Sequence, residues 1–379
     1  MMNRRILLAS ALLVALAACS SKSSKPDLTP APLPVFKPTA ELSTLWKDSL
    51  SSLGESLLAP AFNGGSVYAA GQKGDIARFD AAGRQVWKVR AEAALSSGVS
   101  TNARHVIVAS SDGVLRAYDA ADGKSLWNVT LGGVVLSAPL LTDDLVVVRV
   151  GDSQLVAYGL TDGARKWVYQ RAQAPLALRS HSGMGAAGGL VFAGFPGGKL
   201  VALTAAGGVQ RWESTIAQPK GSNEIERLTD IVGEPVVRGD AVCVAAFQGR
   251  VACVDAATGG QRWARDISSA VGISADAAAV YVTDTDGSVY ALDASTGATA
   301  WKQDKLARRR VGRPLVAGDA VIVADGMGYL HALDRKDGSF LANMRVDSSG
   351  VRAPLLALPN NAFAVQSADG DVYALTLRR

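Results

Sequence analysis

The sequence predicts an all-β protein, an eight-bladed β-propeller of four-stranded antiparallel blades that the N-terminal strand closes into a ring. Three observations predict it: an internal repeat of about 40 residues, a tryptophan at one position of nearly every repeat, and a last repeat that is incomplete. Trp87, Trp127 and Trp167 follow one another at intervals of 40 residues. The 39 glycines and the short apolar runs between them indicate many strands joined by turns.

The repeat unit is clearest at residues 113–127, 249–263 and 287–301, which read GVLRAYDAADGKSLW, GRVACVDAATGGQRW and GSVYALDASTGATAW. Each has a glycine turn, an alternating strand, an aspartate, a second turn that ends in glycine, and a strand that carries tryptophan. The aspartate can accept hydrogen bonds from turn amides, and the glycine can adopt a positive φ. We expect the tryptophans to fill space between blades as large apolar side chains. They are Trp46, Trp87, Trp127, Trp167, Trp212, Trp263 and Trp301.

The eighth copy of the repeat lacks its last strand. It ends in GDVYALTLRR at residues 370–379, whereas an unmatched strand around Trp46 precedes the first complete repeat. The simplest arrangement pairs this N-terminal strand with the last blade. Such closure leaves no free sheet edge and ties the two ends of the domain together.

The N-terminal residues resemble a bacterial lipoprotein signal. Arg4 and Arg5 precede an apolar run over residues 6–18, which is too short for a comfortable membrane span, and LAAC then ends at Cys19. We therefore expect a signal peptide at 1–18, a lipid-modified Cys19 within a proline-rich tether at 19–40, and the propeller at 41–379. Serine rather than aspartate after Cys19 favours the outer membrane, on its periplasmic face. The formal charge of +5 falls to +3 without the two arginines, so nucleic acid is not an expected partner.

Motifs for catalysis or cofactors are weak. Gly183, Gly185 and Gly188 form a literal G-x-G-x-x-G, but a strand follows them instead of the helix that a dinucleotide loop needs. They align with the inner strand of the preceding repeat, at the crowded centre of the ring. The DTDG at 284–287 lacks the later ligands of a calcium loop and is expected to be a turn. The histidines have no ligand spacing. No catalytic, cofactor or metal residues are therefore predicted.

Two repeats are longer than the others, and their extra residues predict a binding surface. Trp167 to Trp212 spans 45 residues and Trp212 to Trp263 spans 51. The additions fall in QRAQAPLALR (170–179) and AQPKGSNEIERLTDIV (217–232), which join one blade's outer strand to the next blade's inner strand. They should therefore be adjacent on one face of the ring, together with Arg308–Arg310, Arg313 and Arg352. The candidate partner-binding residues are Leu176, Leu178, Arg179, Glu224, Arg227 and Asp230.

Two interpretations of these insertions remain open. In an extended segment, Leu176 and Leu178 would point to the same side, and an apolar pair with a charged rim is typical of a protein interface. Alternatively, the leucines fold down to plug the ring and the charges are only solvated. Cys243 and Cys253 flank another turn and are expected to be two small buried apolar residues; a three-residue or bulged loop would instead let them face each other and form a disulfide.

The unit A-x-D-x-x-T-G-x-x-x-W resembles the repeat of quinoprotein (PQQ) dehydrogenase propellers, so a PQQ-dependent oxidoreductase is the alternative function. Such enzymes need a catalytic Asp, a Ca²⁺ held by Glu and Asn, and often a vicinal cysteine pair, and no such set is evident. Over nearly its whole length the chain resembles the BamB family, non-enzymatic lipoproteins of the outer-membrane β-barrel assembly (BAM) complex.

The resemblance to the BamB family implies a partner for the insertions. LALR and EIERLTDI match loops that this family uses to contact the POTRA domains of BamA, which assigns Leu176, Leu178, Arg179 and Asp230 to that contact. The family pattern can have a second aspartate where this chain has Val232. An exposed blade edge could also accept a strand of an unfolded outer-membrane protein.

Overall fold

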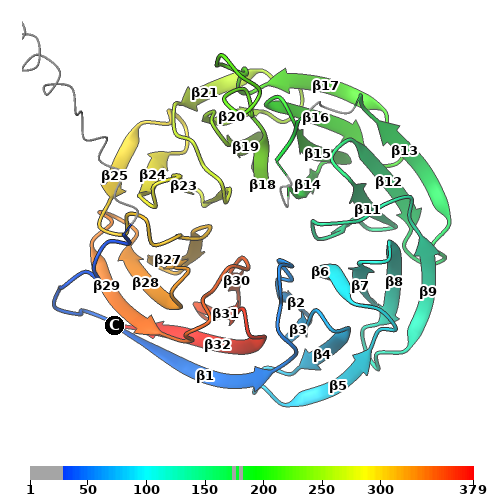
Figure 1. Cartoon of the computed structure of the whole chain (residues 1–379), viewed down its shortest axis with the longest axis horizontal. Helices are drawn as coiled ribbons and strands as arrows, with labels where there is room; N and C mark the ends of the chain where they lie inside the picture. Colours follow the sequence, from blue (N-terminus) through cyan, green and yellow to red (C-terminus); the bar gives the residue numbers. More distant parts are fainter. Residues whose placement is uncertain (1–28, 173–175, 179–181) are drawn as a thin grey trace, which may run out of the picture. The chain divides into compact units, whose positions relative to one another are not determined.

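The computed structural model describes residues 29–172, 176–178 and 182–379, and its compact unit extends from Ala31 to Arg379. In this unit eight four-stranded antiparallel sheets are arranged around a central axis (Figure 1). The predicted eight-bladed propeller is therefore confirmed. No helix within the described parts of the chain is long and apolar enough to cross a membrane.

Each blade takes four strands, from the inner strand at the axis to the outer strand at the rim. Blades 1 to 4 consist of β2 (Ala61–Asn63), β3 (Ser66–Ala70), β4 (Asp75–Phe79) and β5 (Gln85–Arg90); β6 (Leu95–Thr101), β7 (His105–Ser110), β8 (Val114–Asp119) and β9 (Ser125–Thr130); β10 (Leu140–Leu141), β11 (Leu145–Val150), β12 (Gln154–Gly159) and β13 (Arg165–Gln170); and β14 (Met184–Ala187), β15 (Leu190–Phe195), β16 (Lys199–Thr204) and β17 (Gln210–Thr215).

Blades 5 to 8 follow the same order, except that the outer strand of blade 8 comes from the N-terminal side of the chain. They consist of β18 (Ile231–Arg238), β19 (Ala241–Ala246), β20 (Val251–Asp255) and β21 (Gln261–Arg265); β22 (Ile273–Ala275), β23 (Ala279–Thr283), β24 (Val289–Asp293) and β25 (Thr299–Gln303); β26 (Leu315–Ala317), β27 (Ala320–Ala324), β28 (Tyr329–Asp334) and β29 (Phe340–Arg345); and β30 (Leu356–Ala357), β31 (Ala362–Gln366), β32 (Asp371–Arg378) and β1 (Glu41–Ser49).

The ring closes through β1, as predicted. This strand pairs antiparallel with β32, from Glu41 opposite Arg378 to Ser49 opposite Asp371, with one irregularity before Trp46. The Trp46 ring then lies against blade 1, where its centroid is 5.5 Å from that of Phe79. The strand that completes blade 8 therefore also packs against the first blade.

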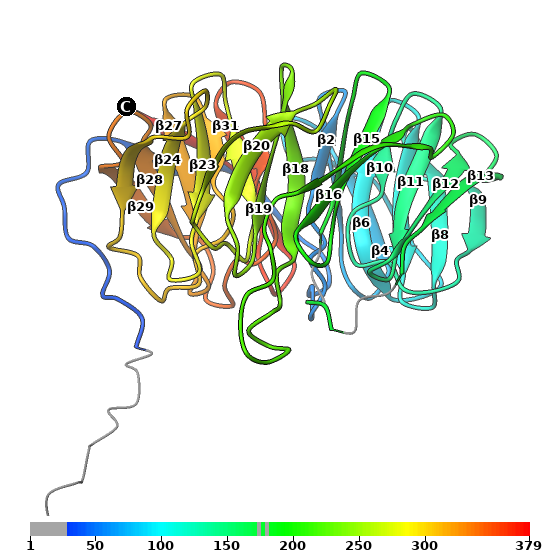
Figure 2. The same ribbon diagram turned by 90° about the horizontal axis from the view of Figure 1, so that it is seen from above.

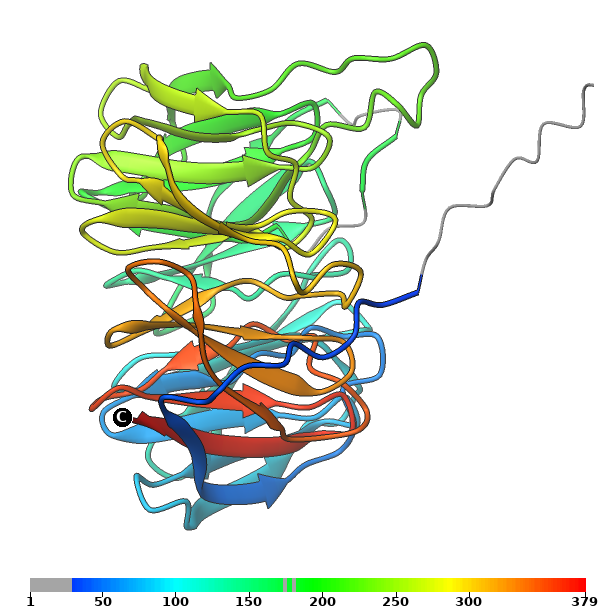
Figure 3. The ribbon, with the colours of Figure 1, turned by 90° about the vertical axis from the view of Figure 1, so that its left-hand side faces the viewer.

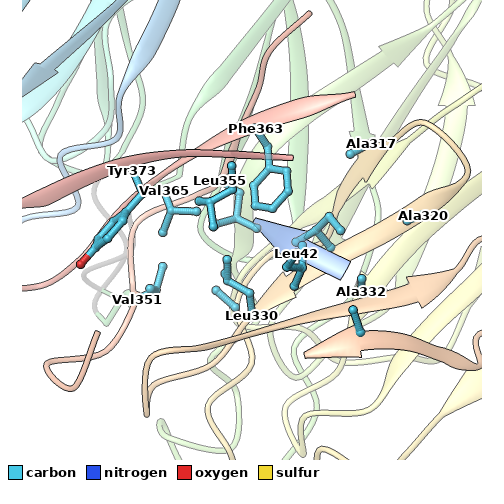
Figure 4. Packing of buried hydrophobic residues seen from close by; sticks show 14 of the residues in the cluster. Leu42, Ala317, Ala320, Leu330, Ala332, Val351, Leu355, Phe363, Val365 and Tyr373 are labelled. Carbon is cyan, nitrogen blue, oxygen red and sulfur yellow. The ribbon is translucent and has the colours of Figure 1, made fainter. Parts of the chain in front are cut away.

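The hydrophobic core of the described residues divides into eight clusters, and each cluster is shared by two neighbouring blades. The second and third strands of the blades are covered on both faces, so they are almost continuously apolar, as in LVVVRV of β11. Figure 4 shows the cluster between blades 7 and 8, where Leu42 of β1 lies among Leu330, Ala332 and Phe363. Contacts between neighbouring blades therefore contribute to the stability of the ring.

The outer-strand tryptophans connect each blade to the next. In six of them the indole N–H donates to a backbone carbonyl of the following blade at 2.8–3.1 Å. The ring also covers the turn glycine of that blade. At Gly297 φ is +70°, and a Cβ there would lie 2.5 Å from the Trp263 ring. The tryptophan and the glycine of the repeat therefore fit each other across the blade interface.

The missing tryptophan of the seventh repeat has a structural reason. Ala342 occupies that position on β29, facing blade 8. Blade 8 has no turn between its third and outer strands, because its outer strand is β1. A tryptophan at this interface would find no turn glycine to cover, and Ala342 instead packs in the same cluster as Leu42.

Residues 31–40 form a strap along blade 7 that the tether prediction did not include. The N–H groups of Thr39 and Ala40 donate to the Leu341 carbonyl, and the Phe36 ring stacks on Phe340 at 5.2 Å. At the other end of the strap the Ala31 N–H donates to a carbonyl of the loop between blades 6 and 7. The strap thus passes from one face of the ring to the other (Figure 2), and the compact unit begins before Glu41.

The connections between an outer strand and the next inner strand all lie on one face of the ring, which we call the insert face. Two of them contain the extra residues: insert A at 171–183, between β13 and β14, and insert B at 216–230, between β17 and β18. Figure 3 shows insert B, in green, standing out from this face. Ala31 also lies on this side, because its partner Ala307 belongs to the connection between β25 and β26.

The two cysteines are buried as expected, but the preference for an unpaired pair over a disulfide was wrong. Cys243 on β19 and Cys253 on β20 lie directly opposite each other and form a disulfide. The Ala246 N–H donates to the Arg250 carbonyl, so the loop consists of the three residues 247–249, with Gln248 at φ +46°. An odd-numbered loop places both cysteines on the same side of the hairpin. Both side chains are fully buried in the cluster between blades 5 and 6.

A candidate protein-interaction surface

The glycine motif belongs to an inner strand, as the repeat predicted. Gly185 lies on β14 and Gly183 directly precedes it, whereas Gly188 is in the following turn with φ +57°. A Cβ on Gly185 would come within 2.6 Å of the Pro235 carbonyl oxygen in blade 5. These glycines therefore allow neighbouring inner strands to approach each other, and a strand follows them instead of a phosphate-binding helix.

Insert A does not present its two leucines as one exposed pair. Leu176 is 44% exposed, whereas Leu178 is half-buried and packs against the cluster between blades 5 and 6. Leu178 also lines the central cavity of the insert face. The plugging interpretation thus describes Leu178, and Leu176 alone remains on the surface. Arg179 lies outside the described residues, as does Cys19.

Insert B contains a compact turn that holds its charged residues on the outside. The Asn223 side chain accepts a hydrogen bond from the Glu226 N–H at 2.9 Å, and Glu226 accepts one from the Ser222 N–H at 2.7 Å. The Arg227 guanidinium donates back to the Gly221 carbonyl at 3.1 Å. Glu224 is exposed. Predicted site residues Glu224 and Arg227 therefore lie on the surface, on a turn that local hydrogen bonds shape.

Asp230 does not face solvent as a partner-binding carboxylate would; only 3% of it is exposed. Its carboxylate accepts hydrogen bonds from the N–H groups of Leu178 at 2.6 Å and Gly197 at 3.2 Å. Its carbonyl accepts a third from the Phe247 N–H at 2.8 Å. Burial raises the pKa of Asp230, while the bonds from Leu178 and Gly197 oppose that rise. Asp230 is therefore a positioning residue that joins insert A to insert B.

Arg149 anchors the far end of insert A. It interrupts the buried strand β11, where its guanidinium donates to the Ser182 carbonyl at 3.0 Å and the Gly194 carbonyl at 2.6 Å. It also lies 4.7 Å from the centre of the Phe195 ring. Burial lowers the pKa of Arg149 to about 10, so it remains protonated at neutral pH. Buried charges need such partners, and the bond to the Ser182 carbonyl fixes the C-terminal end of insert A.

The hairpin of β19 and β20, which the disulfide closes, packs against insert B. The side-chain amide of Gln248, in the loop between β19 and β20, faces backbone carbonyls of insert B. With its nitrogen oriented toward them, it donates to the Glu226 carbonyl at 2.8 Å. A Cβ on the neighbouring Gly249 would lie 2.9 Å from Ala217 at the start of the insert. The insert therefore rests closely on a covalently closed hairpin.

A central cavity of about 330 Å³ opens on the insert face, which we call the axial cavity. Its lining is mostly apolar, and three of its charged side chains are Glu234, Arg313 and Arg352. Arg313 and Glu234 pair at 3.0 Å. The lining consists of Leu57, Ala59, Leu136, Ser137, Ala138, Leu178, Val232, Gly233, Glu234, Phe247, Ala270, Val271, Gly312, Arg313, Arg352 and Pro354.

The axial cavity does not have the residues that PQQ with Ca²⁺ would need. Glu234 is the one carboxylate among the described residues of its lining, and it is already paired with Arg313. Ca²⁺ prefers six to eight oxygen ligands, including several carboxylates or amides. The described residues contain no group of three His, Cys, Asp or Glu arranged to hold a metal. At DTDG, Asp284 accepts the N–H groups of Asp286 and Ser288, as in a turn.

Sequence reasoning missed the most exposed large apolar residue among the described residues of the two inserts. Ile225, at the tip of insert B, is 69% exposed between two glutamates. The sequence feature that could have identified Ile225 is a large apolar residue between charged residues in a polar insertion. Together with Leu176, it gives each insert one exposed apolar side chain, while Asp230 and Arg149 hold the backbone beneath. Exposed apolar side chains with charged neighbours, on a backbone that buried residues hold in place, are typical of a protein-binding surface.

Comparisons with known proteins agree with this architecture. The family model described as outer membrane protein assembly factor BamB matches residues 72–303. The outer membrane protein assembly factor BamB of Bordetella pertussis is 39% identical over 345 residues, 90% of this chain and 89% of that protein. The one from Burkholderia pseudomallei is 38% identical over 373 residues, 98% of this chain and 97% of that protein.

Solved structures show the same fold. The crystal structure of BamB from Moraxella catarrhalis has a TM-score of 0.81 and 25% identity, over 89% of this chain and all of that one. The quinohemoprotein alcohol dehydrogenase of Comamonas testosteroni has a TM-score of 0.69 at 15% identity, over 88% of this chain and 76% of that one, a likeness of fold alone.

Fold and surface together define an eight-bladed propeller of PQQ-like repeats in which two adjacent inserts elaborate one face. The described lining of the axial cavity does not offer the carboxylate and amide ligands that Ca²⁺ with PQQ would need. Identity over nearly the full length then places the protein more narrowly: the chain belongs to the family of the outer membrane protein assembly factor BamB.

Proposed function

We propose that the protein is a non-enzymatic scaffold subunit of the BAM complex, which binds the periplasmic POTRA domains of BamA through its insert face. The observation that carries the proposal is the hydrogen bond between Leu178 and Asp230, because it makes one surface of two inserts. Family membership supports the assembly role. The resemblance of LALR and EIERLTDI to BamA-contacting loops supports the choice of partner.

In this proposal the ring is a rigid support and the inserts provide the contact. Leu176 and Ile225 supply apolar area, and Glu224 and Arg227 supply charges near it. The family resemblance assigns Arg179 to the same contact. Because Asp230 and Arg149 already fix the inserts, little conformational entropy is lost on docking. A preorganised surface of this kind holds POTRA domains in a defined geometry while β-barrels fold and insert.

We further propose that a lipid on Cys19 anchors the protein to the periplasmic face of the outer membrane. The strap supports this arrangement, because Ala31 is held on the insert face. Eleven residues separate Cys19 from Ala31, and a chain of that length reaches at most about 40 Å. The anchor would therefore keep the binding surface close to the membrane and concentrate it near its partner.

Affinity capture of BamA from detergent-solubilised membranes tests the proposal. The tagged full-length protein should recover BamA, and Leu176→Glu should reduce recovery at least tenfold by placing a charge in the contact. The Leu178→Ala, Arg179→Ala double variant should do the same. Val209→Glu is the matched control, because Val209 is 62% exposed on a turn of the opposite face. Recovery of BamA by all variants at the wild-type level would refute the assignment.

A further inference from the structure

The axial cavity is a second recognition site whose chemistry differs from that of the exposed inserts. It lies where the inner ends of seven blades meet, and loops from around the ring contribute to it. Leu57, Leu136 and Phe247 give it apolar walls. Its volume of about 330 Å³ is at the low end of the range for ligand pockets, roughly 300–1,000 Å³. One or two apolar side chains would fill it.

The wall of the cavity also holds a polar group without a partner. Ser137 is 4% exposed, and its hydroxyl has no hydrogen-bond partner among the described residues. It lies at the inner edge of blade 3, in the lining of the cavity. A buried hydroxyl that makes no hydrogen bond is costly, so a ligand with a carbonyl or amide group would be favoured there. A purely apolar ligand would leave Ser137 unsatisfied.

The rim has a net positive charge. Two guanidinium groups, those of Arg313 and Arg352, face one carboxylate, that of Glu234. Arg313 pairs with Glu234, whereas Arg352 is exposed and donates to the Gly54 carbonyl at 3.2 Å. A single backbone contact leaves donors of Arg352 for an incoming carboxylate, which guanidinium binds in a bidentate manner. The favoured ligand is therefore acidic next to its apolar part.

We propose that the axial cavity binds an extended polypeptide segment in which an apolar side chain is adjacent to an acidic residue. The apolar side chain enters the cavity, the segment's backbone carbonyl accepts from Ser137, and its carboxylate pairs with Arg352 on the rim. A polypeptide carries an apolar side chain, a backbone carbonyl and a carboxylate on adjacent residues, whereas a simple lipid anion lacks the backbone carbonyl and a small inorganic anion lacks the apolar part. The cavity shares Leu178 with insert A but contains neither Leu176 nor Ile225, and a peptide can occupy it without BamA.

Fluorescence anisotropy with labelled peptides tests the proposal on the full-length protein. The probe is the heptapeptide Gly-Gly-Glu-Phe-Asp-Gly-Gly, compared with one in which serine replaces phenylalanine and one in which lysines replace both acids. We expect each comparison peptide to bind at least tenfold more weakly. Ala270→Trp should weaken the acidic peptide at least tenfold by filling the cavity, because Ala270 is exposed and lines it. Arg352→Glu should do so by reversing the rim charge.

Two variants control for general effects. Ala103→Trp and Arg104→Glu make the same changes at exposed positions in the turn between β6 and β7, on the opposite face, and should bind like wild type. Absence of peptide binding, equal binding of the lysine peptide, or unchanged binding by Ala270→Trp would each overturn the proposal. Binding of dodecanoate but no peptide would assign the cavity to lipid anions and also overturn it. BamA capture is scored separately, so its loss in Leu176→Glu leaves the peptide result intact.

Discussion

The backbone N–H of Leu178 donates to the buried carboxylate of Asp230 at 2.6 Å, across 52 residues of sequence and between adjacent blades. The bond holds the described parts of the two inserts together, although none of their described residues lies in a regular strand or helix. The carboxylate is turned away from solvent, because only 3% of Asp230 is exposed. We therefore expect Asp230 to affect binding through the conformation of insert A.

Removal of this carboxylate should loosen insert A without unfolding the ring. In Asp230→Ala, the N–H groups of Leu178 and Gly197 lose their acceptor, at a cost of about 1–3 kcal/mol. Hydrogen exchange should become faster in residues 176–178 and at Gly197, and remain unchanged in blades 1 and 7. BamA capture should fall with it. Asp230→Asn keeps one acceptor oxygen and should have an intermediate effect; exchange equal to wild type in both variants would contradict the positioning role.

Substitution of Gly297, which contacts Trp263, should lower the free energy of unfolding by more than the positive φ of that glycine alone would explain. A Cβ at Gly297 would lie 2.5 Å from the indole, whereas a Cβ at Gly239 would meet nothing within 4 Å, although φ is positive at both. Gly239→Ala should cost roughly 1 kcal/mol for the left-handed backbone. Gly297→Ala should lower the free energy of unfolding by clearly more, because the Trp263 indole must move to make room for the Cβ. Urea unfolding measures both, and equal costs would mean that the indole adapts freely.

Most of the ring could be predicted from the sequence because its determinants are local and repeated. The Asp turns, for example, form as expected: Asp293 accepts the N–H groups of Ser295 and Thr296. The pairing of β1 with β32 was also predictable, since one strand was missing at one end and one was unmatched at the other. Repetition turns a weak local pattern into a reliable one.

The sequence predicted where the inserts lie in the chain but not their conformation, because that conformation depends on contacts between residues distant in sequence. Alternation predicts that Leu176 and Leu178 point the same way only if the segment is regular, and the bond to Asp230 turns Leu178 toward the axis. The disulfide depended on whether the loop has two or three residues, which composition does not determine. The packing of Ala342 in the cluster that contains Leu42 likewise required the structure.

Loss of the disulfide should affect insert B more than the rest of the ring. We expect the double variant Cys243→Ala, Cys253→Ala to lose about 2–3 kcal/mol of unfolding free energy, the order of magnitude for a short loop. Because Gln248 and Phe247 at the hairpin tip contact the insert, hydrogen exchange should rise in residues 221–230. Reduced wild type should unfold at the midpoint of the variant, and the variant should not respond to reductant. A reductant effect on the variant would point to another cause.

The strap should depend on a buried ion pair. Arg309 donates to the Asp325 carboxylate at 2.7 Å and to the Ala31 carbonyl at 2.9 Å, and His331 lies 3.1 Å from the same carboxylate. Asp325→Asn leaves the buried guanidinium without its counter-charge, which costs about 3–5 kcal/mol. The strap should then detach, and chymotrypsin should cut after Phe36. Asp319→Asn is the control, because Asp319 pairs with Arg379 on the surface.

The same pair gives the strap a defined pH dependence. Burial alone would raise the pKa of Asp325, but hydrogen bonds from His331, the Tyr329 N–H and Arg309 outweigh it and lower the pKa below the ordinary 3.8. A lowered pKa means that the stabilisation is complete above the unfolded-state value and is lost as pH falls through the folded-state value. The difference in unfolding free energy between wild type and Asp325→Asn should therefore be constant near neutral pH and shrink below about pH 4. A difference that grew on acidification would show that the carboxylate is not ionised in the folded ring.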